Sequence, residues 1–156
     1  MPIYINGIET INGELSSVHS ETSALKSYAF AKSGVAPTLA AGVAVPAGVD
    51  AAWNLSSAYA TVCASAVISS AFQITGIIAE AFSTSGMYEI VIYEGNEVGS
   101  TEVARSRTYG STLAPMNNNF IPICSPSLAA GKAIRAKVGA SSTGGQVTIS
   151  VAYKVV

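Results

Sequence analysis

The stretch Gln146-Val147-Thr148-Ile149-Ser150-Val151-Ala152-Tyr153-Lys154-Val155 decides the fold class of this chain. Every second residue from Val147 to Val155 is a large apolar one, and the residues between them are small or polar. Side chains two positions apart lie on the same face of a strand. The pattern therefore predicts an antiparallel strand with one face in a core and the other toward solvent.

A second alternating run precedes this stretch. Ile134, Ala136 and Val138 alternate with Arg135 and Lys137, and the loop 141–145, rich in Ser and Gly, joins the two runs. Two alternating runs with a short Gly-containing connection are typical of a β-hairpin. The sequence therefore predicts a hairpin here with a five-residue connection.

Further apolar, β-branched or aromatic runs predict more strands at Val43–Pro46, Ala51–Leu55, Tyr59–Val67, Phe72–Phe82, Met87–Glu94, Val98–Arg107 and Met116–Cys124. Gly76 within its run indicates a bulge or a close backbone approach, and Pro122 indicates an edge strand or a strand end. About eight strands separated by turn residues predict an all-β antiparallel sandwich, with either jelly-roll or immunoglobulin-like topology.

The first 40 residues have a different pattern, with two Asn-Gly pairs and scattered apolar residues. We expect an N-terminal arm at residues 1–40 and the sandwich domain at residues 41–156. If the arm attaches the domain to a partner, the residues expected to become buried there are Ile3, Ile5, Ile8, Ile11 and Leu15.

Composition excludes several classes of function. Hydrophobic residues make up 49% of the chain and charged residues 11%, against about 25% charged in ordinary soluble domains. The net charge is −1 with no basic block, so we expect neither a nucleic-acid partner nor a membrane partner. Low surface charge instead favours association with other protein subunits. The N-terminal residues show no secretory pattern, which predicts assembly in a cytoplasm.

Catalytic and metal-binding groups are sparse. His19 and Asp50 are the single residues of their types, and no nucleotide-binding or acyl-transfer motif occurs. Cys63 and Cys124 have no clustered partners for a metal, so we expect two buried, reduced thiols. We expect no enzyme activity, no cofactor and no metal.

Four glutamates, Glu89, Glu94, Glu97 and Glu102, could pair as in a glycoside hydrolase. Their spacing favours solvated positions on a loop and a sheet face instead.

Arg105 and Arg107 lie two positions apart and so share one face of a strand, as do Arg135 and Lys137. Two interpretations stay open: pairing across strands with Glu89 or Glu102, or a charge pair between subunits. The aromatic residues also allow two interpretations, core or interface packing and a sugar-binding face. These aromatic residues are Trp53, Tyr88, Tyr93, Tyr109 and Tyr153.

Residues 40–156 resemble small structural proteins of tailed bacteriophage virions. The resemblance rests on the succession of the stretches 43–48, 51–55, 74–78, 88–95, 129–138 and 147–153. It implies a β-sandwich that decorates or fastens the head, or that lies in the neck or tail, with attachment through an N-terminal arm.

These observations lead to one functional expectation: a non-enzymatic virion protein, most concretely a capsid decoration or cement protein that binds and stabilises the assembled head. Its partners would be the major capsid protein or other virion proteins and copies of itself, with a homotrimer as the expected oligomer. The alternatives are a neck, tail, baseplate or head-fibre attachment component, and a receptor- or carbohydrate-binding module.

Overall fold

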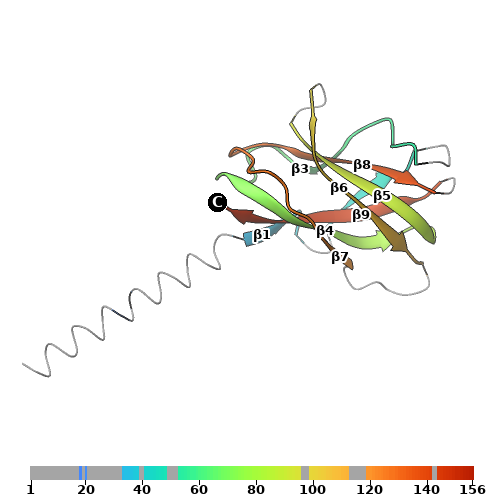
Figure 1. Cartoon of the computed structure of the whole chain (residues 1–156), viewed down its shortest axis with the longest axis horizontal. Coiled ribbons are helices and arrows are strands. Elements are labelled where there is room, and N and C mark those ends of the chain that lie inside the picture. The colour runs from blue at the N-terminus through green and yellow to red at the C-terminus, as the bar shows by residue number, and fades with distance from the viewer. Residues whose placement is uncertain are drawn as a thin grey trace, which may run out of the picture. The chain divides into compact units, whose positions relative to one another are not determined.

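The structure is a computed structural model (Figure 1). It describes residues 18, 20, 33–38, 41–48, 53–95, 99–112, 119–141 and 144–156. The chain divides into two compact units, Met1–Ser33 and Gly34–Val156. In the first unit, Val18 and Ser20 are helical and exposed. The predicted attachment residues of the arm lie outside the described residues: Ile3, Ile5, Ile8, Ile11 and Leu15.

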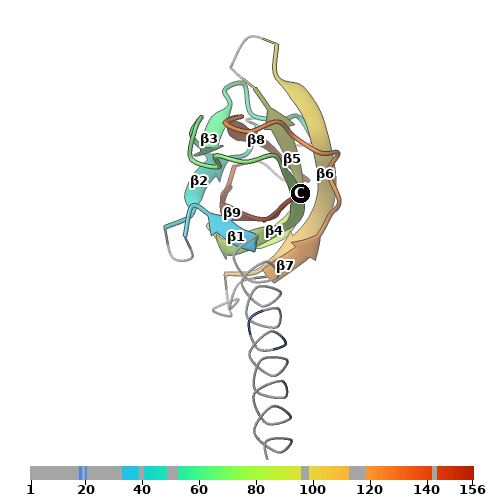
Figure 2. The same ribbon diagram turned by 90° about the vertical axis from the view of Figure 1, so that its left-hand side faces the viewer.

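The described residues contain nine strands, which form two antiparallel sheets packed face to face (Figure 2). The first sheet has the order β1 (Ser33–Ala36), β9 (Gln146–Val155), β4 (Phe72–Phe82) and β7 (Asn119–Pro122), and β2 (Val43–Pro46) also pairs with β9. The second sheet has the order β3 (Ala60–Cys63), β8 (Ile134–Ala140), β5 (Gly86–Glu94) and β6 (Thr101–Gly110). The predicted all-β sandwich is confirmed.

The strand order is that of a jelly roll. From β2 onward, consecutive strands lie in opposite sheets, with the pair β5 and β6 as the exception. This alternation produces the two four-strand orders β2-β9-β4-β7 and β3-β8-β5-β6. Of the two topologies left open by the sequence, the chain therefore adopts the jelly roll.

The predicted hairpin between the last two alternating runs is wrong. β8 pairs with β3 and β5 in the second sheet, whereas β9 pairs with β2 and β4 in the first. Alternation determines which side chains face the core, but it does not determine which strand each run pairs with. The connection 141–145 passes from one sheet to the other.

The core lies between the two sheets, and β9 contributes to it as its alternation predicts. Val147, Ile149 and Val151 are completely buried, and the ring of Tyr153 meets the ring of Phe72 edge-on with centroids 6.0 Å apart. Facing residues from the other strands complete the core: Ile74 and Ile77 of β4, Ile90 and Ile92 of β5, and Ile134 and Val138 of β8.

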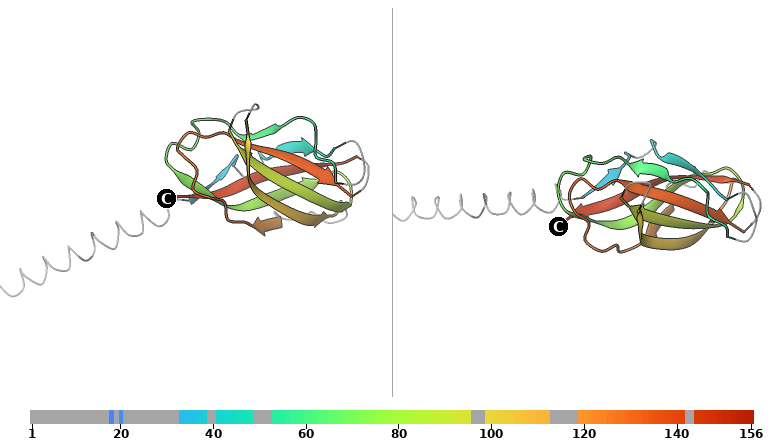
Figure 3. Two further views of the ribbon diagram at one scale, coloured as in Figure 1. Left: turned by 45° about the horizontal axis from the view of Figure 1, so that its top comes forward. Right: turned by 90° about the horizontal axis from the view of Figure 1, so that it is seen from above.

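Gly76 and Pro122 lie in the contexts that the sequence predicts. The pairing of β4 with β9 shifts register between Ile74 and Gly76, and a Cβ atom at Gly76 would come within 2.1 Å of the Phe120 ring. β7 is the edge strand of its sheet and ends at Pro122. At this edge the Asn119 side chain donates a hydrogen bond to the Thr108 hydroxyl of β6 (3.1 Å), and Figure 3 shows β6 and β7 side by side.

Several predicted boundaries differ from the observed ones. Residues 53–55 form no strand; instead, the Trp53 and Ser56 N–H groups donate to the carbonyl oxygens of Ala140 and Val138, so this segment borders β8. β3 ends at Cys63 rather than at Val67, because residues 65–66 form a turn.

The start of the first strand and the exposure of one cysteine also differ from expectation. β1 begins at Ser33 and joins the first sheet, so sheet pairing starts before the expected domain boundary at residue 41. Cys63 is a buried free thiol as predicted, and burial raises its pKa. Cys124 is free but exposed, which corrects the prediction of two buried thiols, because it follows the short edge strand β7.

Candidate interaction surface

The outer face of the second sheet carries most of the charged side chains of the described strands. On β5, Ile90 and Ile92 point into the core, so the alternate residues point outward. We call this surface the basic face. It comprises Met87, Glu89 and Tyr93 of β5, Glu102, Arg105, Arg107 and Tyr109 of β6, Arg135 and Lys137 of β8, and the adjacent Trp53 and Tyr59. Val91 of β5 has the same alternation but is completely buried.

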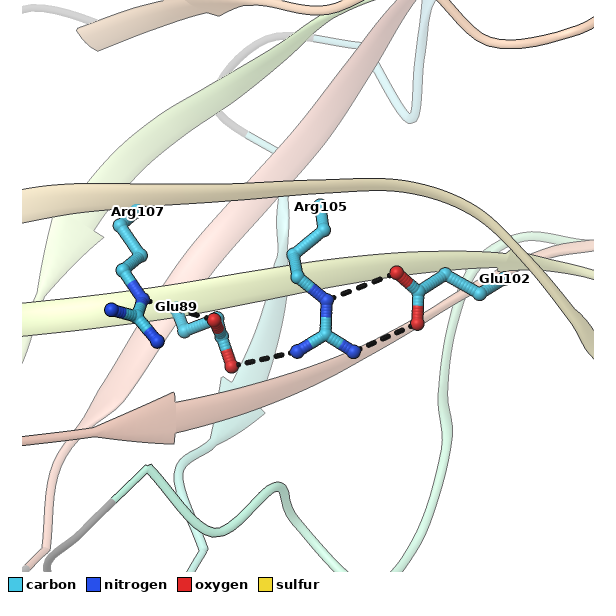
Figure 4. Close-up of polar contacts among 4 residues, drawn as sticks. All are labelled: Glu89, Glu102, Arg105 and Arg107. Atoms are coloured by element: carbon cyan, nitrogen blue, oxygen red, sulfur yellow. Dashed lines mark hydrogen bonds and ion pairs between the residues drawn. The ribbon is translucent and has the colours of Figure 1, made fainter.

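Glu89 is at the centre of the basic face and is buried beneath two arginines. Its carboxylate accepts hydrogen bonds from Arg105 Nη1 and from Arg107 Nε, each at 3.0 Å (Figure 4). Its side chain is only 6% exposed, whereas those of Arg105 and Arg107 are 45% and 55% exposed. The prediction of a solvated Glu89 is therefore wrong. The residue does point outward, but the arginine side chains from β6 cover it.

Glu102 forms the second half of this ion-pair network. Its two carboxylate oxygens accept hydrogen bonds from Arg105 Nε (3.0 Å) and Nη2 (2.8 Å). A register shift between Ile92 and Tyr93 in the β5–β6 pair places Glu102 and Arg105, three residues apart, on the same face. These hydrogen bonds lower the pKa of Glu102 and raise that of Arg105.

Arg107 is held from two sides. Its Nε donates to Glu89, and its guanidinium carbon lies 4.2 Å from the centre of the Trp53 ring. Trp53 has the unusual backbone angle φ of 66°, and its carbonyl oxygen lies 2.9 Å from where a Cβ atom of Gly139 would be. The absence of a side chain at Gly139 thus allows the Trp53 segment to lie against β8.

A second cation–aromatic contact lies on the side of β3. Lys137 Nζ is 4.2 Å from the centre of the Tyr59 ring and donates to the Ser57 carbonyl (3.0 Å). The Tyr59 ring in turn meets Tyr93 edge-on at 5.0 Å. Burial raises the pKa of Tyr93, and the nearby Glu102 carboxylate raises it further. Arg135 Nε donates to the Gly95 carbonyl (3.0 Å).

The end of the basic face next to Arg107 exposes apolar surface. Met87 and Tyr109 lie directly opposite each other on β5 and β6 and are 38% and 59% exposed. Each is two residues from a member of the ion-pair network, Glu89 and Arg107 respectively, and so shares its face. Exposed aromatic and Met side chains beside an arginine are enriched in protein–protein interfaces.

Charge is unevenly distributed between the basic face and the rest of the chain. The face holds four basic residues, Arg105, Arg107, Arg135 and Lys137, and two acidic ones, Glu89 and Glu102. The whole chain has eight basic and nine acidic residues, so the remainder holds four and seven. A chain of net charge −1 thus presents one face of net positive charge.

The structure answers some of the questions about the arginines, tyrosines and glutamates that the sequence left open. Arg105 and Arg107 both pair across strands with Glu89 of β5, as one interpretation predicted, and Arg105 also pairs with Glu102 of its own strand, β6. Tyr88 is buried in the core, and Tyr153 packs against it. Glu94 lies 3.9 Å from Lys132 at the end of β5, away from Glu89. Sequence reasoning missed the burial of Glu89 and the Arg107–Trp53 contact, because both depend on residues distant in sequence.

Within the described ranges, no group of three or more His, Cys, Asp or Glu side chains is arranged to hold a metal ion. No helix among those residues is long and apolar enough to cross a bilayer. Every buried side-chain nitrogen or oxygen there has a hydrogen-bond partner.

Comparisons with known proteins give little beyond the fold. No known protein family and no curated protein matches the sequence. Among solved structures, the chain is similar to the Eiger TNF protein of S. frugiperda, with 11% identity and a TM-score of 0.40 over 80% of this chain and 92% of that one. It is also similar to a chain of infectious bursal disease virus, Gt strain, with 13% identity and a TM-score of 0.41 over 80% of this chain and 32% of the viral one. At such scores neither similarity carries information on activity or partners.

Proposed function

We propose that this chain is a non-enzymatic structural protein of a bacteriophage virion, and most concretely a decoration or cement protein of the capsid. In this function the sandwich binds the assembled shell and copies of itself, and the N-terminal arm contributes to attachment to the major capsid protein. Its location is then the virion, after assembly in the host bacterial cytoplasm.

The observation that carries the proposal is the basic face. Its charged groups neutralise and orient one another, as in the contacts of Glu89 with Arg105 and Arg107. The exposed side chains beside this network are Met87 and Tyr109, which suit contact with another protein surface. The low charge content of the chain and its resemblance to virion proteins support the same function.

The proposed mechanism is stabilisation by mass action. A protein that binds only the assembled shell stabilises it by RT ln(1 + [L]/Kd), which is about 2.7 kcal/mol when the free concentration is about 100 times Kd. Many copies attached to one shell add avidity without any single strong contact. No reaction chemistry is needed for this effect.

The test is the number of copies of this chain in purified virions, measured by quantitative mass spectrometry against the major shell protein. A decoration protein is expected at the same order of abundance as the shell subunit. A few copies per particle would move the protein to the neck, tail, baseplate or a head fibre. Absence from the particle would contradict the virion function altogether.

A second test concerns the arm. Deletion of residues 1–16, which include Ile3, Ile5, Ile8, Ile11 and Leu15, is expected to abolish binding to particles while the sandwich stays folded. Binding is measured by cosedimentation with shells, and the fold by circular dichroism. Undiminished binding of the deleted chain would remove the arm from the proposed mechanism.

A carbohydrate-binding module is a weaker alternative. The Trp53 ring would be its natural stacking platform, but the Arg107 guanidinium already lies over that ring at 4.2 Å. Glycan-array binding that is lost in Trp53→Ala would favour this alternative over the virion function.

A further inference from the structure

We propose that the end of the basic face around Arg107 binds a second copy of this chain, and that the second copy contributes a carboxylate to the Arg107 guanidinium. This inference names the surface and the chemistry of the self-association in the proposed function. It does not depend on where in a virion the protein lies.

Arg107 is oriented to receive a carboxylate. Its Nε donates to Glu89, and its guanidinium carbon lies 4.2 Å from the Trp53 ring centre. Its two terminal nitrogens have no hydrogen-bond partner among the described residues, and the side chain is 55% exposed. Two terminal guanidinium nitrogens form a rigid fork that matches the two oxygens of a carboxylate. Because the fork is already fixed, less conformational entropy is lost on binding.

The other cationic side chains of the basic face are already engaged in contacts within the chain. Arg105 donates from all three of its nitrogens, to Glu89 and Glu102. Lys137 is held by the Ser57 carbonyl and the Tyr59 ring, and Arg135 donates to the Gly95 carbonyl. Of the two arginines that the sequence marks as interface candidates, Arg107 is therefore the one with donors to offer a partner.

Apolar side chains flank Arg107 and complete the surface. Tyr109 and Met87 stand opposite each other on β6 and β5, one position further along the same face, and both are exposed. Tyrosine, tryptophan and arginine are the residue types that dominate binding energy in protein interfaces. Apolar neighbours exclude water from a charged pair and so strengthen it.

The distribution of charge along the sequence supports a second copy as the partner. The basic face has two more basic than acidic residues, and the remainder of the chain has three more acidic than basic ones. The ion-pair network next to Arg107 is itself balanced, with Glu89 and Glu102 against Arg105 and Arg107. The proposed attraction therefore rests on the two terminal donors of Arg107 and on the excess of carboxylates elsewhere in the chain. Contact between two different surfaces of identical chains is heterologous, and it closes into a ring when the rotation permits.

The experiment is sedimentation velocity of the full chain over a concentration series, at low and at high sodium chloride. The variants are Arg107→Gln, Arg107→Lys and Tyr109→Thr. Lys154→Gln is the matched control, because it removes the same charge from an exposed position of β9 on the other sheet. We expect the wild-type chain to self-associate, and to do so more weakly at high salt.

In Arg107→Gln and Tyr109→Thr the dissociation constant is expected to rise by at least about tenfold, and in Lys154→Gln by less than about twofold. Arg107→Lys keeps the charge but loses the fork, and is expected to behave more like Arg107→Gln than like the wild type. If loss of the Arg107–Glu89 pair unfolds the chain, Arg107→Gln cannot report on association. Tyr109→Thr then serves instead, because Tyr109 is exposed and its replacement is not expected to unfold the chain.

Two results would overturn the inference. One is a wild-type chain that stays monomeric at every concentration, which would exclude a second copy as the partner. The other is association that neither Arg107→Gln nor Tyr109→Thr weakens, which would place the contact elsewhere. Neither result changes the number of copies in virions, so failure here is distinguishable from failure of the proposed function.

Discussion

The two outer faces of the sandwich differ sharply in charge, although the inner faces of both sheets are apolar. The strands of the first sheet contain two charged residues, Glu80 and Lys154. The strands of the second contain seven. On the first sheet, Glu80 accepts hydrogen bonds from the Ser150 hydroxyl and from the Gly42 N–H, a self-contained arrangement. On the second, Glu102, Arg105, Glu89 and Arg107 form a chain of ion pairs. This chain ends at Arg107, whose two terminal nitrogens have no hydrogen-bond partner among the described residues. Alternate residues of the same strands thus determine the core and the charged outer face separately.

The sharpest test of this separation changes adjacent residues of one strand. Ile149→Ala, which removes a completely buried side chain of β9, is expected to lower the free energy of unfolding by about 2–5 kcal/mol, because it leaves a cavity in the core. Thr148→Ala on the outward side of the same strand is the control, with an expected change within about 0.5 kcal/mol. Urea denaturation measures both. A similar loss for the two variants would contradict the division between inner and outer positions.

The next test compares one carboxylate on each outer face. Glu89→Gln places an amide nitrogen against Arg105 or Arg107, where a carboxylate oxygen accepts a charge-assisted hydrogen bond. We expect a loss of about 1.5–3 kcal/mol in the free energy of unfolding. This is below the cost of breaking a fully buried pair, because both arginines are about half exposed.

Glu80→Gln is the matched variant on the first sheet. Its amide oxygen can still accept from the Ser150 hydroxyl, and the bond that is lost, from the Gly42 N–H at 3.3 Å, is long and has a neutral donor. We therefore expect a smaller loss, below about 1 kcal/mol. Equal losses at Glu80 and Glu89, measured by the same denaturation, would mean that the arginine pairs of the basic face add nothing to stability.

The two outer faces also differ in what packs against a glycine on each: backbone atoms at Gly139 and a side chain at Gly76. A Cβ atom at Gly139 would meet backbone atoms of Trp53 at 2.9 and 3.1 Å, whereas one at Gly76 would meet the half-exposed ring of Phe120. Gly139→Ala is expected to cost about 1–2 kcal/mol, because the backbone must shift. Gly76→Ala is expected to cost less, because the Phe120 ring can rotate away.

Trp53 is the only tryptophan, so its fluorescence reports on this segment alone. We expect a red-shifted emission in Gly139→Ala and an unchanged one in Gly76→Ala. An unchanged spectrum in both variants would show that the Trp53 segment does not depend on close contact with β8.

The sequence predicts the interior of this molecule better than its outer faces. Alternation in 146–155 correctly identifies the buried side of β9, because burial recurs with the local period of the strand. The same pattern gives the wrong partner for β8, because a five-residue connection suits either a hairpin or a crossing between sheets. The edge position of β7 is predicted by Pro122, since proline lacks the N–H needed for pairing on both sides.

The basic face is predicted only in part. Its outward positions follow from alternation, and pairing of Arg105 and Arg107 with Glu89 or Glu102 is one of the two predicted arrangements. The burial of Glu89 does not follow, because it arises from guanidinium groups 16 and 18 residues away. The contact of Arg107 with Trp53 depends on a loop that settles beside β8 at Gly139, and no local pattern records that.

The smallest expected effect concerns the acidic end of the basic face. Hydrogen bonds from Arg105 hold the pKa of Glu102 below its ordinary value of 4.5. A carboxyl group whose pKa is lower in the folded state stabilises the fold above its unfolded pKa, and this contribution is lost as pH falls through the folded pKa. Because the Glu102 side chain is 40% exposed, we expect less than about 1 kcal/mol, and less still at high salt.

NMR titration of the Glu102 carboxyl carbon measures this effect directly. In Arg105→Gln the pKa is expected to rise toward 4.5, because the variant removes the donors that favour the charged form. Arg107→Gln is the control, because Arg107 contacts Glu89 rather than Glu102. If Arg107→Gln raised the Glu102 pKa as much as Arg105→Gln does, the basic face would titrate as one coupled unit, and Arg107 would be linked to the acidic end as well as to its own carboxylate.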